Sequence, residues 1–552
     1  MKRGRLILLV GMMLSVFGMP AWAQQTRYVA VEGNDAGNTC LDAAAPCASV
    51  GRALAVAEAG DVIEVGAGTF YEGDLTLHTD VTLRGAGADV TVLDADASDG
   101  PSETRIERIP PAVALLRAGV RVAYKHAGSP HAHVLRVEAG VTARVEGLTL
   151  QDGGDLFTDN RQGGGVWNAG TLTLARVIVR DNVASVASDY EAEPRGGGIW
   201  NGGTLHLVES LVERNAAAGF LIEGGRGGGI WNEGTLVLER STVAANTASD
   251  VQDACYGAGL YNAGTLTVRN STLSGNALAC FEGGAGGGFF NAGEALVEAV
   301  TLTDNTVQAA WDGPAARGGG LAATRTASTR VRGSLVAGNT AVDGDATADC
   351  DGLTASEGFN VFGNGTGCPA GATDTLVDPA SVFTAVLGPL ADHGGPTPVH
   401  ALLAGSPAVD AGTCLLASGD TLAVDQRGYT RWDGACDAGA FEEGATDTTH
   451  EKVAVATEEA PADLPAAVRL EGNYPNPFNP STQIVYTLAE ARPVRLAVYD
   501  VLGRQVALLV DGLQPAGRQA VTFAADGLPG GLYVYRLEAG REVQTRTMML
   551  VK

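Results

Sequence analysis

The chain has 552 residues, 45% of them hydrophobic, and it contains 76 glycines. This composition excludes an intrinsically disordered chain and indicates a turn-rich protein with room for more than one domain. The formal net charge of −26 argues against nucleic acid as a partner. Such an excess of carboxylates is typical of a solubility device, and attraction of Ca²⁺ outside the cell is the alternative. We therefore expect no cofactor, with Ca²⁺ as the open alternative.

Residues 1–23 have the pattern of a secretory signal peptide. Three basic residues in the first five positions precede an apolar run that begins at Leu6, and an Ala-Trp-Ala sequence that fits a signal-peptidase site ends at Ala23. These features predict export, with the periplasm as the first destination. No later apolar run reaches the roughly 18 residues needed to cross a bilayer, so we expect no transmembrane span.

The cysteines indicate disulfide bonds. In an exported protein an even number of cysteines predicts disulfides, and pairing within each close couple is the simplest connectivity. A zinc site is the weaker interpretation, because no C-x-x-C occurs and only eight histidines are scattered along the chain, so we expect no metal site. The eight cysteines form four couples: Cys40 with Cys47, Cys255 with Cys280, Cys350 with Cys368, and Cys414 with Cys436.

Between residues 161 and 345 the sequence repeats a unit of about 30 residues. Each unit contains an aromatic residue followed by Asn, and later an aliphatic residue three positions before a second Asn. The interval between the two Asn is 14 residues in all five units. The aromatic-Asn steps are Trp167-Asn168, Trp200-Asn201, Trp231-Asn232, Tyr261-Asn262 and Phe290-Asn291, and the second Asn are Asn182, Asn215, Asn246, Asn276 and Asn305.

Segments such as GTLVLERSTVAAN show alternation, β-branched residues and Gly or Asn breaks, which predict short strands rather than helices. Three such strands with their turns need about 20 to 25 residues, so each unit is one triangular coil plus an extended loop. We therefore predict an all-β protein with a parallel β-helix, right-handed by the crossover rule. Cys255 and Cys280 lie in adjacent loops, and their disulfide would tie neighbouring coils together.

The two Asn columns have a physical reason. In stacked coils each Asn lies about 4.8 Å from the next, so its amide can donate to one neighbour and accept from the other at a buried turn. If the residues on either side of each aromatic point inward, period-2 alternation sends the rings outward. Such a column could bind the apolar faces of sugars, or it could be a structural ladder under the loops, which we favour. The candidate binding residues are Trp167, Trp200, Trp231, Tyr261 and Phe290.

The GGGIWN…STVAANTA units resemble the repeats of polymorphic outer-membrane proteins and of the pectate-lyase-like right-handed β-helix superfamily. By this resemblance, residues 24–160 are an N-terminal cap and the first coils, with a helix from Val50 to Ala59 closing the first coil. Residues 161–345 are the repeat coils.

Residues 346–442 are the carboxy-terminal end of the predicted β-helix. The stretch from GPLADHGGPTPVHALLAGSPAVDAG to DAGAFE is similar to the choice-of-anchor Q family, whose members end their β-helix in this way. Its polar residues invite a catalytic interpretation, but we expect a structural cap held together by charge pairs. These residues are His400, Asp410, Asp425, Arg427 and Asp437.

Residues 443–468 lose the alternation and predict a linker. The segment 469–552 alternates strands with Gly and Pro turns, which predicts a small antiparallel β-sandwich. Its NYPNPFNP, VYDVLGR and GLY sequences closely resemble the carboxy-terminal sorting domain of the type IX secretion system. The resemblance implies that the type IX machinery is a partner, and that the protein reaches the outer cell surface or is released.

Whether the chain is an enzyme stays open, and we favour a non-enzymatic role. Pectate-lyase-like enzymes abstract a proton with a basic residue, but the chain has only four lysines and none between residues 126 and 451. Arg180, Arg214 and Arg240 could serve, although a solvated face also explains them. We expect adhesion or contact with a polysaccharide or another surface polymer. A polysaccharide lyase or related carbohydrate-active enzyme is the alternative, and a structural surface component is the second alternative.

Overall fold

The computed structural model divides into two compact units, residues Met1–Glu451 and Lys452–Lys552. The predicted signal peptide, residues 1–23, and most of the predicted linker lie outside the described residues. The structure describes residues 24–96, 133–154, 162–186, 193–219, 224–250, 253–309, 316–342, 348–353, 355–431, 435–445, 469–474, 478, 480–488, 492–500, 504–514, 517–525, 528–529, 531–539 and 542–550.

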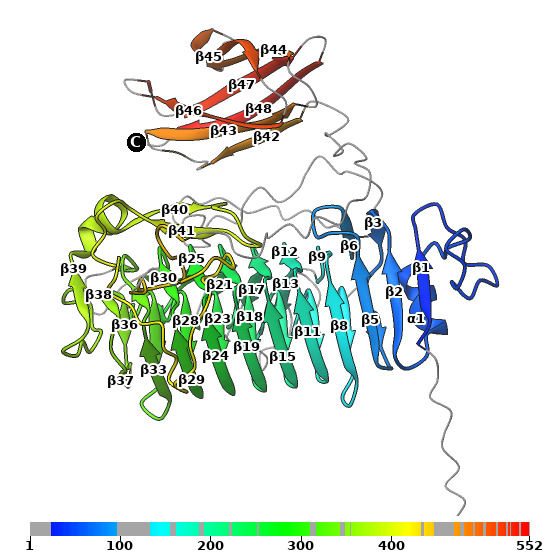
Figure 1. Cartoon of the computed structure of the whole chain (residues 1–552), viewed down its shortest axis with the longest axis horizontal. Helices are drawn as coiled ribbons and strands as arrows, with labels where there is room; N and C mark the ends of the chain where they lie inside the picture. Colours follow the sequence, from blue (N-terminus) through cyan, green and yellow to red (C-terminus); the bar gives the residue numbers. More distant parts are fainter. Residues whose placement is uncertain are drawn as a thin grey trace, which may run out of the picture. The chain divides into compact units, whose positions relative to one another are not determined.

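The first unit is a parallel β-helix, in which stacked coils contribute strands to three long sheets (Figure 1). Sheet A contains β1 (Thr26–Val29), β2 (Asp61–Val65), β5 (Val81–Gly85), β8 (Thr142–Glu146), β11 (Thr171–Ala175), β15 (Thr204–Val208), β19 (Thr235–Glu239), β24 (Thr265–Arg269), β29 (Glu294–Glu298), β33 (Ser328–Arg332) and β37 (Ala355–Ser356). Sheet B contains β3 (Gly68–Tyr71), β6 (Thr91–Asp94), β9 (Thr149–Gln151), β12 (Ile178–Arg180), β16 (Leu211–Glu213), β20 (Thr242–Ala244), β25 (Thr272–Ser274), β30 (Thr301–Thr303), β34 (Leu335–Val336), β38 (Val361–Gly363) and β39 (Thr375–Val377). Sheet C contains β4 (Leu75–Leu77), β7 (Leu135–Val137), β10 (Val166–Asn168), β14 (Ile199–Asn201), β18 (Ile230–Asn232), β23 (Leu260–Asn262), β28 (Phe289–Asn291), β32 (Leu321–Ala323) and β36 (Cys350–Asp351).

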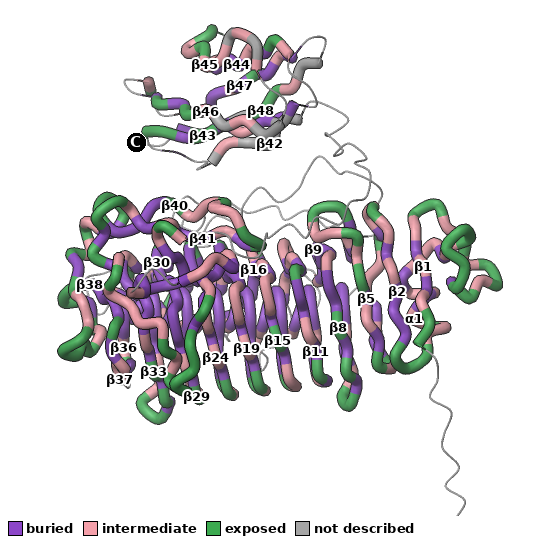
Figure 2. Tube along the Cα trace, in the orientation of Figure 1, coloured by how far each residue is buried: buried purple, intermediate pink, exposed green. Residues whose placement is uncertain are grey.

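Strand register confirms the alignment of the repeats on the aromatic-Asn step. Trp167 pairs with Trp200, Trp200 with Trp231, and the same column continues through Tyr261 to Phe290. The aliphatic column also belongs to the interior core, and buried positions recur from coil to coil (Figure 2). Burying one such side chain contributes about 1.5–3 kcal/mol. Its members are each at most 1% exposed: Val179, Val212, Val243, Leu273 and Leu302.

The first Asn column forms a continuous ladder of buried amides. The Nδ2 of Asn168 donates to Oδ1 of Asn201 at 2.7 Å, and Asn201 donates in the same way to Asn232 at 2.7 Å. The ladder continues through Asn262 to Asn291 and ends on the hydroxyl of Thr329. The predicted role of these residues is therefore confirmed.

The second Asn column bonds twice between coils. Both the backbone N–H and the Nδ2 of Asn215 donate to Oδ1 of Asn246, each at 3.0 Å. At the far end, Asn339 donates both groups to Oδ1 of Asp349 at 2.8 Å. A carboxylate can end the ladder because the last position only has to accept hydrogen bonds. Burial raises the pKa of Asp349, against the hydrogen bonds from Asn339.

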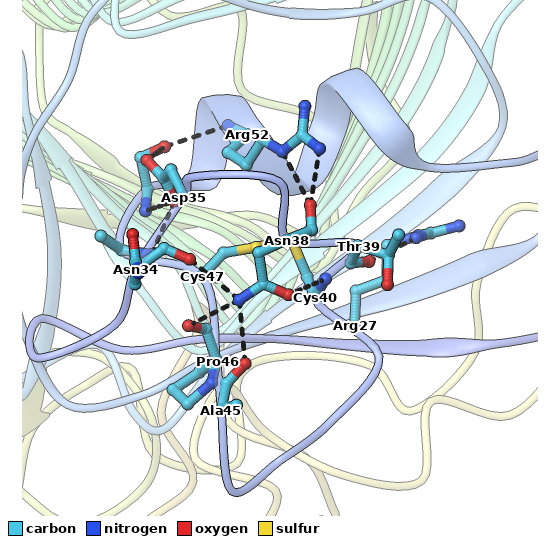
Figure 3. The surroundings of a disulfide bond; sticks show 12 residues. Arg27, Asn34, Asp35, Asn38, Thr39, Cys40, Ala45, Pro46, Cys47 and Arg52 are labelled. Carbon is cyan, nitrogen blue, oxygen red and sulfur yellow. Dashed lines mark hydrogen bonds between the residues drawn. A yellow bond between two sulfur atoms is a disulfide. The ribbon is translucent and has the colours of Figure 1, made fainter.

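The N-terminal end carries a disulfide-bonded loop and one short helix (Figure 3). Helix α1 (Val50–Val56) begins after Ser49, whose side chain accepts from the N–H of Arg52, and it is shorter than the predicted helix to Ala59. Arg52 donates through Nε to the carbonyl of Asn38 at 2.8 Å. The helix is thus fixed to the segment that leads into the disulfide-bonded loop.

A buried ion pair lies in the first coil. Arg27 of β1 aligns with the inward-facing Ile63, and its Nε donates to Asp61 at 2.7 Å. Both side chains are almost fully buried, and Arg27 also donates to the carbonyl of Thr39. The pair lies at the end of the apolar interior, and its mutual attraction compensates the cost of removing both charges from water.

Each repeat coil contains a fourth strand, which the prediction of three strands missed. These strands form a six-stranded sheet D at the base of the variable loops. They are short and rich in Ala and Ser, so they lack the large alternating side chains that reveal a strand in sequence. Small side chains here pack into a separate apolar cluster with Cys255 and Cys280. Sheet D contains β13 (Val183–Val186), β17 (Ala216–Gly219), β21 (Thr247–Asp250), β26 (Ala277–Cys280), β31 (Thr306–Ala309) and β35 (Thr340–Val342), and β22 (Cys255–Tyr256) pairs with β27 (Gly284–Ala285) in the returning loops.

Residues 382–431 and 435–442, here called the strap, lie along the outer face of sheet B (Figure 1). The strap reaches back to β20, five strands before the last strand of the sheet, whereas the sequence suggested an end cap. One expected charge pair is present, with Arg427 at 2.7 Å from Asp425, whereas Asp410 bonds Asp437 through its backbone N–H. The regular elements around the strap are η1 (Pro379–Ser381), η2 (Val382–Val386), β40 (Leu387–Ala391) and β41 (Val399–Leu402).

Buried polar groups fasten the strap to the coils. Arg431 pairs with Glu442 at 3.0 Å and donates to Oδ1 of Asn270 in the coil. The amide oxygen of Gln426 accepts from Thr272 at 2.7 Å. These hydrogen bonds give the strap a defined position on sheet B, because leaving any of these buried groups unpaired would cost about 1–3 kcal/mol.

The second unit consists of two antiparallel sheets, which confirms the predicted small sandwich-like domain. Its own core contains aromatic side chains such as Phe478, Tyr486 and Tyr535. One sheet contains β42 (Arg469–Tyr474), β43 (Ser481–Leu488) and β46 (Gly517–Ala524), and the other contains β44 (Arg492–Asp500), β45 (Gln505–Gln514), β47 (Gly531–Ala539) and β48 (Glu542–Leu550).

The buried His400 should make the stability of the strap depend on pH. Nδ1 of His400 bonds the carbonyl of Gly388 and must carry the proton, so Nε2 accepts from Ser274 at 2.8 Å. Burial lowers the pKa of His400 to about 4, from an ordinary value of 6.5. The unfolded imidazole therefore binds more protons between pH 6.5 and pH 4, so strap stability falls as the pH is lowered through this range, by up to about 3 kcal/mol.

Thermal unfolding between pH 7 and pH 4 measures this effect. We expect His400→Gln to reduce the loss of Tm over this range, because a neutral amide replaces the titrating group. His206, which is exposed on the outer face of sheet A, provides the control variant His206→Gln. If both variants lose as much Tm as the parent protein between pH 7 and pH 4, the assignment of this loss to His400 is wrong.

Candidate functional site

The five aromatic candidates point outward from sheet C, as predicted, but the neighbouring loop residues cover most of them. Exposure is 9% for Trp200, 4% for Trp231, 8% for Tyr261 and 6% for Phe290, while Trp167 is half-buried. The covering residues precede each Gly-Gly-Gly and bridge from loop to loop, as Arg195 does with Arg226. The rings form an apolar cluster separate from the interior core.

Stacking and cation–π contacts hold this aromatic column together. Trp231 and Tyr261 stack with centroids 4.1 Å apart, and the guanidinium of Arg195 lies 4.7 Å from the Trp231 ring. The indole N–H of Trp231 donates to Glu233 at 2.8 Å, and Arg195 pairs with the same carboxylate at 2.9 Å. Such contacts add about 0.5–1.5 kcal/mol per pair beyond burial. The column therefore has the environment of scaffold residues.

The structure contains all four disulfides between close couples. The bond between Cys255 and Cys280 joins β22 to the end of β26, with the Cα atoms 5.9 Å apart. It links two neighbouring coils, as the loop positions suggested. Each crosslink restricts the unfolded chain, which typically contributes about 2–4 kcal/mol to stability.

Among the described residues, the outer face of sheet B is only partly covered by the strap. Residues Ile178 and Leu211 are paired neighbours on β12 and β16, and both are partly exposed. Arg180 and Glu213, two residues further along the same strands, are also neighbours in the strand register. The adjoining turns place Asp181 and Arg214 beside them. We call these four charged residues the quartet.

The quartet is a connected network of ion pairs. Arg214 donates from Nε and Nη2 to the two oxygens of Asp181, both at 2.9 Å, and also pairs with Glu213. Arg180 donates to Oε1 of Gln151 at 3.0 Å and lies 3.9 Å from Asp181. Gln151 donates in turn to the buried Asp94 at 2.8 Å. Sequence reasoning identified Arg180 and Arg214 but missed the carboxylates, because the network joins different coils.

The strap ends this open surface on one side. Thr242 of β20, the next strand after β16, is fully buried and donates to the carbonyl of Pro398 at 2.7 Å. Thr397 bonds the carbonyl of Arg240, which itself pairs with Glu209 at 2.8 Å. The strip on β12 and β16, bounded by residues 397–398 of the strap, is therefore the candidate functional surface.

The geometry limits the chemistry of this surface. Burial lowers the pKa of Arg214, but its hydrogen bonds to Asp181 and the charge of Glu213 outweigh this and raise the pKa. A guanidinium that holds its proton so firmly is a poor general base. Within the described segments, no group of three or more His, Cys, Asp or Glu residues is placed to hold a metal ion.

Covered and half-covered rings should differ in their effect on stability. We expect Trp231→Ala to lower the free energy of unfolding by about 3–5 kcal/mol, because it leaves a cavity in a buried column. Trp167→Ala, at the half-buried end, should cost clearly less. Guanidinium denaturation of both variants measures the difference. Equal destabilisation would contradict the greater coverage of Trp231.

Comparison with solved structures finds matches at low sequence identity. Pectate lyase Pel9A is 14% identical, with a TM-score of 0.37, over 76% of this chain and 96% of that chain. XylC, in a complex with xylose, is 10% identical with a TM-score of 0.32 over 76% of this chain and 99% of that chain. Pectin methylesterase PemA from Erwinia chrysanthemi is 11% identical with a TM-score of 0.22, over 65% and 95% of the respective chains. No curated protein matches.

The carboxy-terminal unit matches a known family. Residues 473–552 fit the model described as secretion system C-terminal sorting domain. No helix in the described part of the chain is long and apolar enough to cross a membrane. Because they match this family model, residues 473–552 are a type IX secretion sorting domain, which indicates export to the cell surface or the extracellular space.

Proposed function

We propose that this protein is a non-enzymatic β-helix adhesin that contacts a polysaccharide through the open strip of sheet B. It passes through the periplasm, and the type IX machinery recognises residues 469–552. The observation that carries the proposal is the pairing of Ile178 and Leu211 beside the quartet, on the part of sheet B that the strap leaves uncovered.

This combination suits an extended carbohydrate. Sugar rings present apolar C–H faces and a rim of hydroxyls, so they need apolar contact and hydrogen-bonding groups side by side. Ile178 and Leu211 supply the apolar contact, and the quartet supplies donors and acceptors held in place by their own ion pairs. The flat sheet surface offers the same spacing of about 4.8 Å from coil to coil, which fits a repeating ligand.

The aromatic column takes a supporting role in this proposal. Four of its five rings are at most 9% exposed, so the covered rings offer little surface for sugar stacking. A lyase is disfavoured because Arg214 retains its proton and Arg240 is engaged with Glu209. Neither arginine is placed as the free base that proton abstraction requires.

The test is binding of the exported chain to a panel of soluble polysaccharides by affinity electrophoresis, with absorbance recorded for unsaturated products. We expect at least one polysaccharide to bind without product formation. The double variant Ile178→Ser/Leu211→Ser should weaken this binding about tenfold, or about 1.4 kcal/mol.

The matched control changes two partly exposed apolar residues on the outer face of sheet A, Val237→Ser and Leu296→Ser. Binding should persist in this control. Unsaturated products would overturn the non-enzymatic assignment. Absence of any binding would favour a structural surface component, and equal loss in both double variants would remove sheet B as the contact surface.

A further inference from the structure

We infer that the polymer recognised by the open strip is a neutral, hydroxyl-rich glycan rather than a polyanion. This inference rests on the proposed function and adds the charge class of the ligand. It follows from how the arginines of the strip are already engaged, and from the charge of the whole chain.

The charges of the quartet are satisfied within the protein. Arg214 forms a bidentate pair with Asp181, with both N–O distances at 2.9 Å, and it also contacts Glu213. Arg180 is bonded to Gln151 and faces Asp181. A carboxylate on a ligand would have to displace an existing carboxylate partner, so it would gain little net interaction energy.

The arginines at the other end of these strands also have carboxylate neighbours. Arg240 pairs with Glu209 at 2.8 Å, and Arg176 lies 3.5 Å from the same carboxylate and 3.8 Å from Glu146. The complete chain carries a net charge of −26. A polyanion approaching the quartet therefore meets no unpaired cation there, and it is repelled by the excess of carboxylates in the whole chain, most strongly at low salt.

A neutral glycan avoids both costs. Its hydroxyls can donate to the remaining lone pairs of Asp181 and Glu213 and accept from arginine N–H groups, and hydrogen bonds to charged groups are the stronger kind. Its C–H faces can lie on Ile178 and Leu211. Because no net charge is neutralised, binding should depend only weakly on ionic strength.

The experiment compares two derivatives of one β-glucan backbone, neutral hydroxyethyl cellulose and anionic carboxymethyl cellulose. The probe is the exported full chain in affinity electrophoresis, repeated from low to high salt. We expect the neutral polymer to bind at least tenfold more tightly, with an affinity that stays constant with salt.

A variant that frees the arginines makes the test sharper. Asp181→Asn removes the carboxylate to which Arg214 donates. The affinity for carboxymethyl cellulose should therefore rise in low salt, while the affinity for hydroxyethyl cellulose should fall. The matched control is Glu357→Gln, which frees Arg330 from an exposed pair on sheet A. It should leave both affinities unchanged.

The outcomes separate this inference from the proposed function. Tighter, salt-sensitive binding of the anionic polymer by the unmodified chain would overturn the neutral-ligand inference and leave polysaccharide contact intact. Binding of neither polymer, nor of any member of the wider panel, would overturn the proposed function itself. Equal gains in Asp181→Asn and Glu357→Gln would show that overall charge, not the quartet, decides the preference.

Discussion

An asparagine amide carries both a donor and an acceptor, and the β-helix depends on this property at two turns of its repeat coils. Each amide donates to the next coil and accepts from the previous one, so a polar turn can be buried without leaving a group unpaired. In the second ladder the backbone N–H of each Asn uses the same acceptor, as Asn215 does with Asn246. A coil shifted by one residue would break both bonds, so the two ladders fix the register of the repeat coils.

A fixed register then decides which surfaces can meet a partner. It stacks the aromatic rings on sheet C, where the returning loops cover most of them. It also aligns Thr242, Thr272 and Ser274 as attachment points for the strap on sheet B. The loops cover most rings of sheet C, and the strap covers part of sheet B. Among the described residues, the strip on β12 and β16 beside the strap carries both apolar and charged groups. The site arises from what the loops and strap leave uncovered.

The sequence predicted the repeats well because the 14-residue interval repeats in five units. It predicted the disulfides because each couple lies close in the chain, and it predicted the outward direction of the aromatic rings from alternation. It missed the fourth strand, since strands such as Ala216–Gly219 lack large alternating side chains. The quartet was also hidden, because Asp181 and Arg214 come from different coils and no local pattern joins them. Whether loops cover Trp231 depends on tertiary packing, which alternation does not encode.

Hydrogen exchange of Asn246→Ala tests the central role of the amide ladder most directly. This substitution removes the acceptor for Asn215 and the donor to Asn276, so amides in both neighbouring coils, residues 211–219 and 272–280, should exchange faster than in the parent protein. Residues 61–85 of the first coils should keep their protection, as should all coils in the exposed-site control Thr235→Ala. Faster exchange confined to residues 242–250, with unchanged neighbours, would contradict the account, because it would mean that the coils do not depend on one another through their amides.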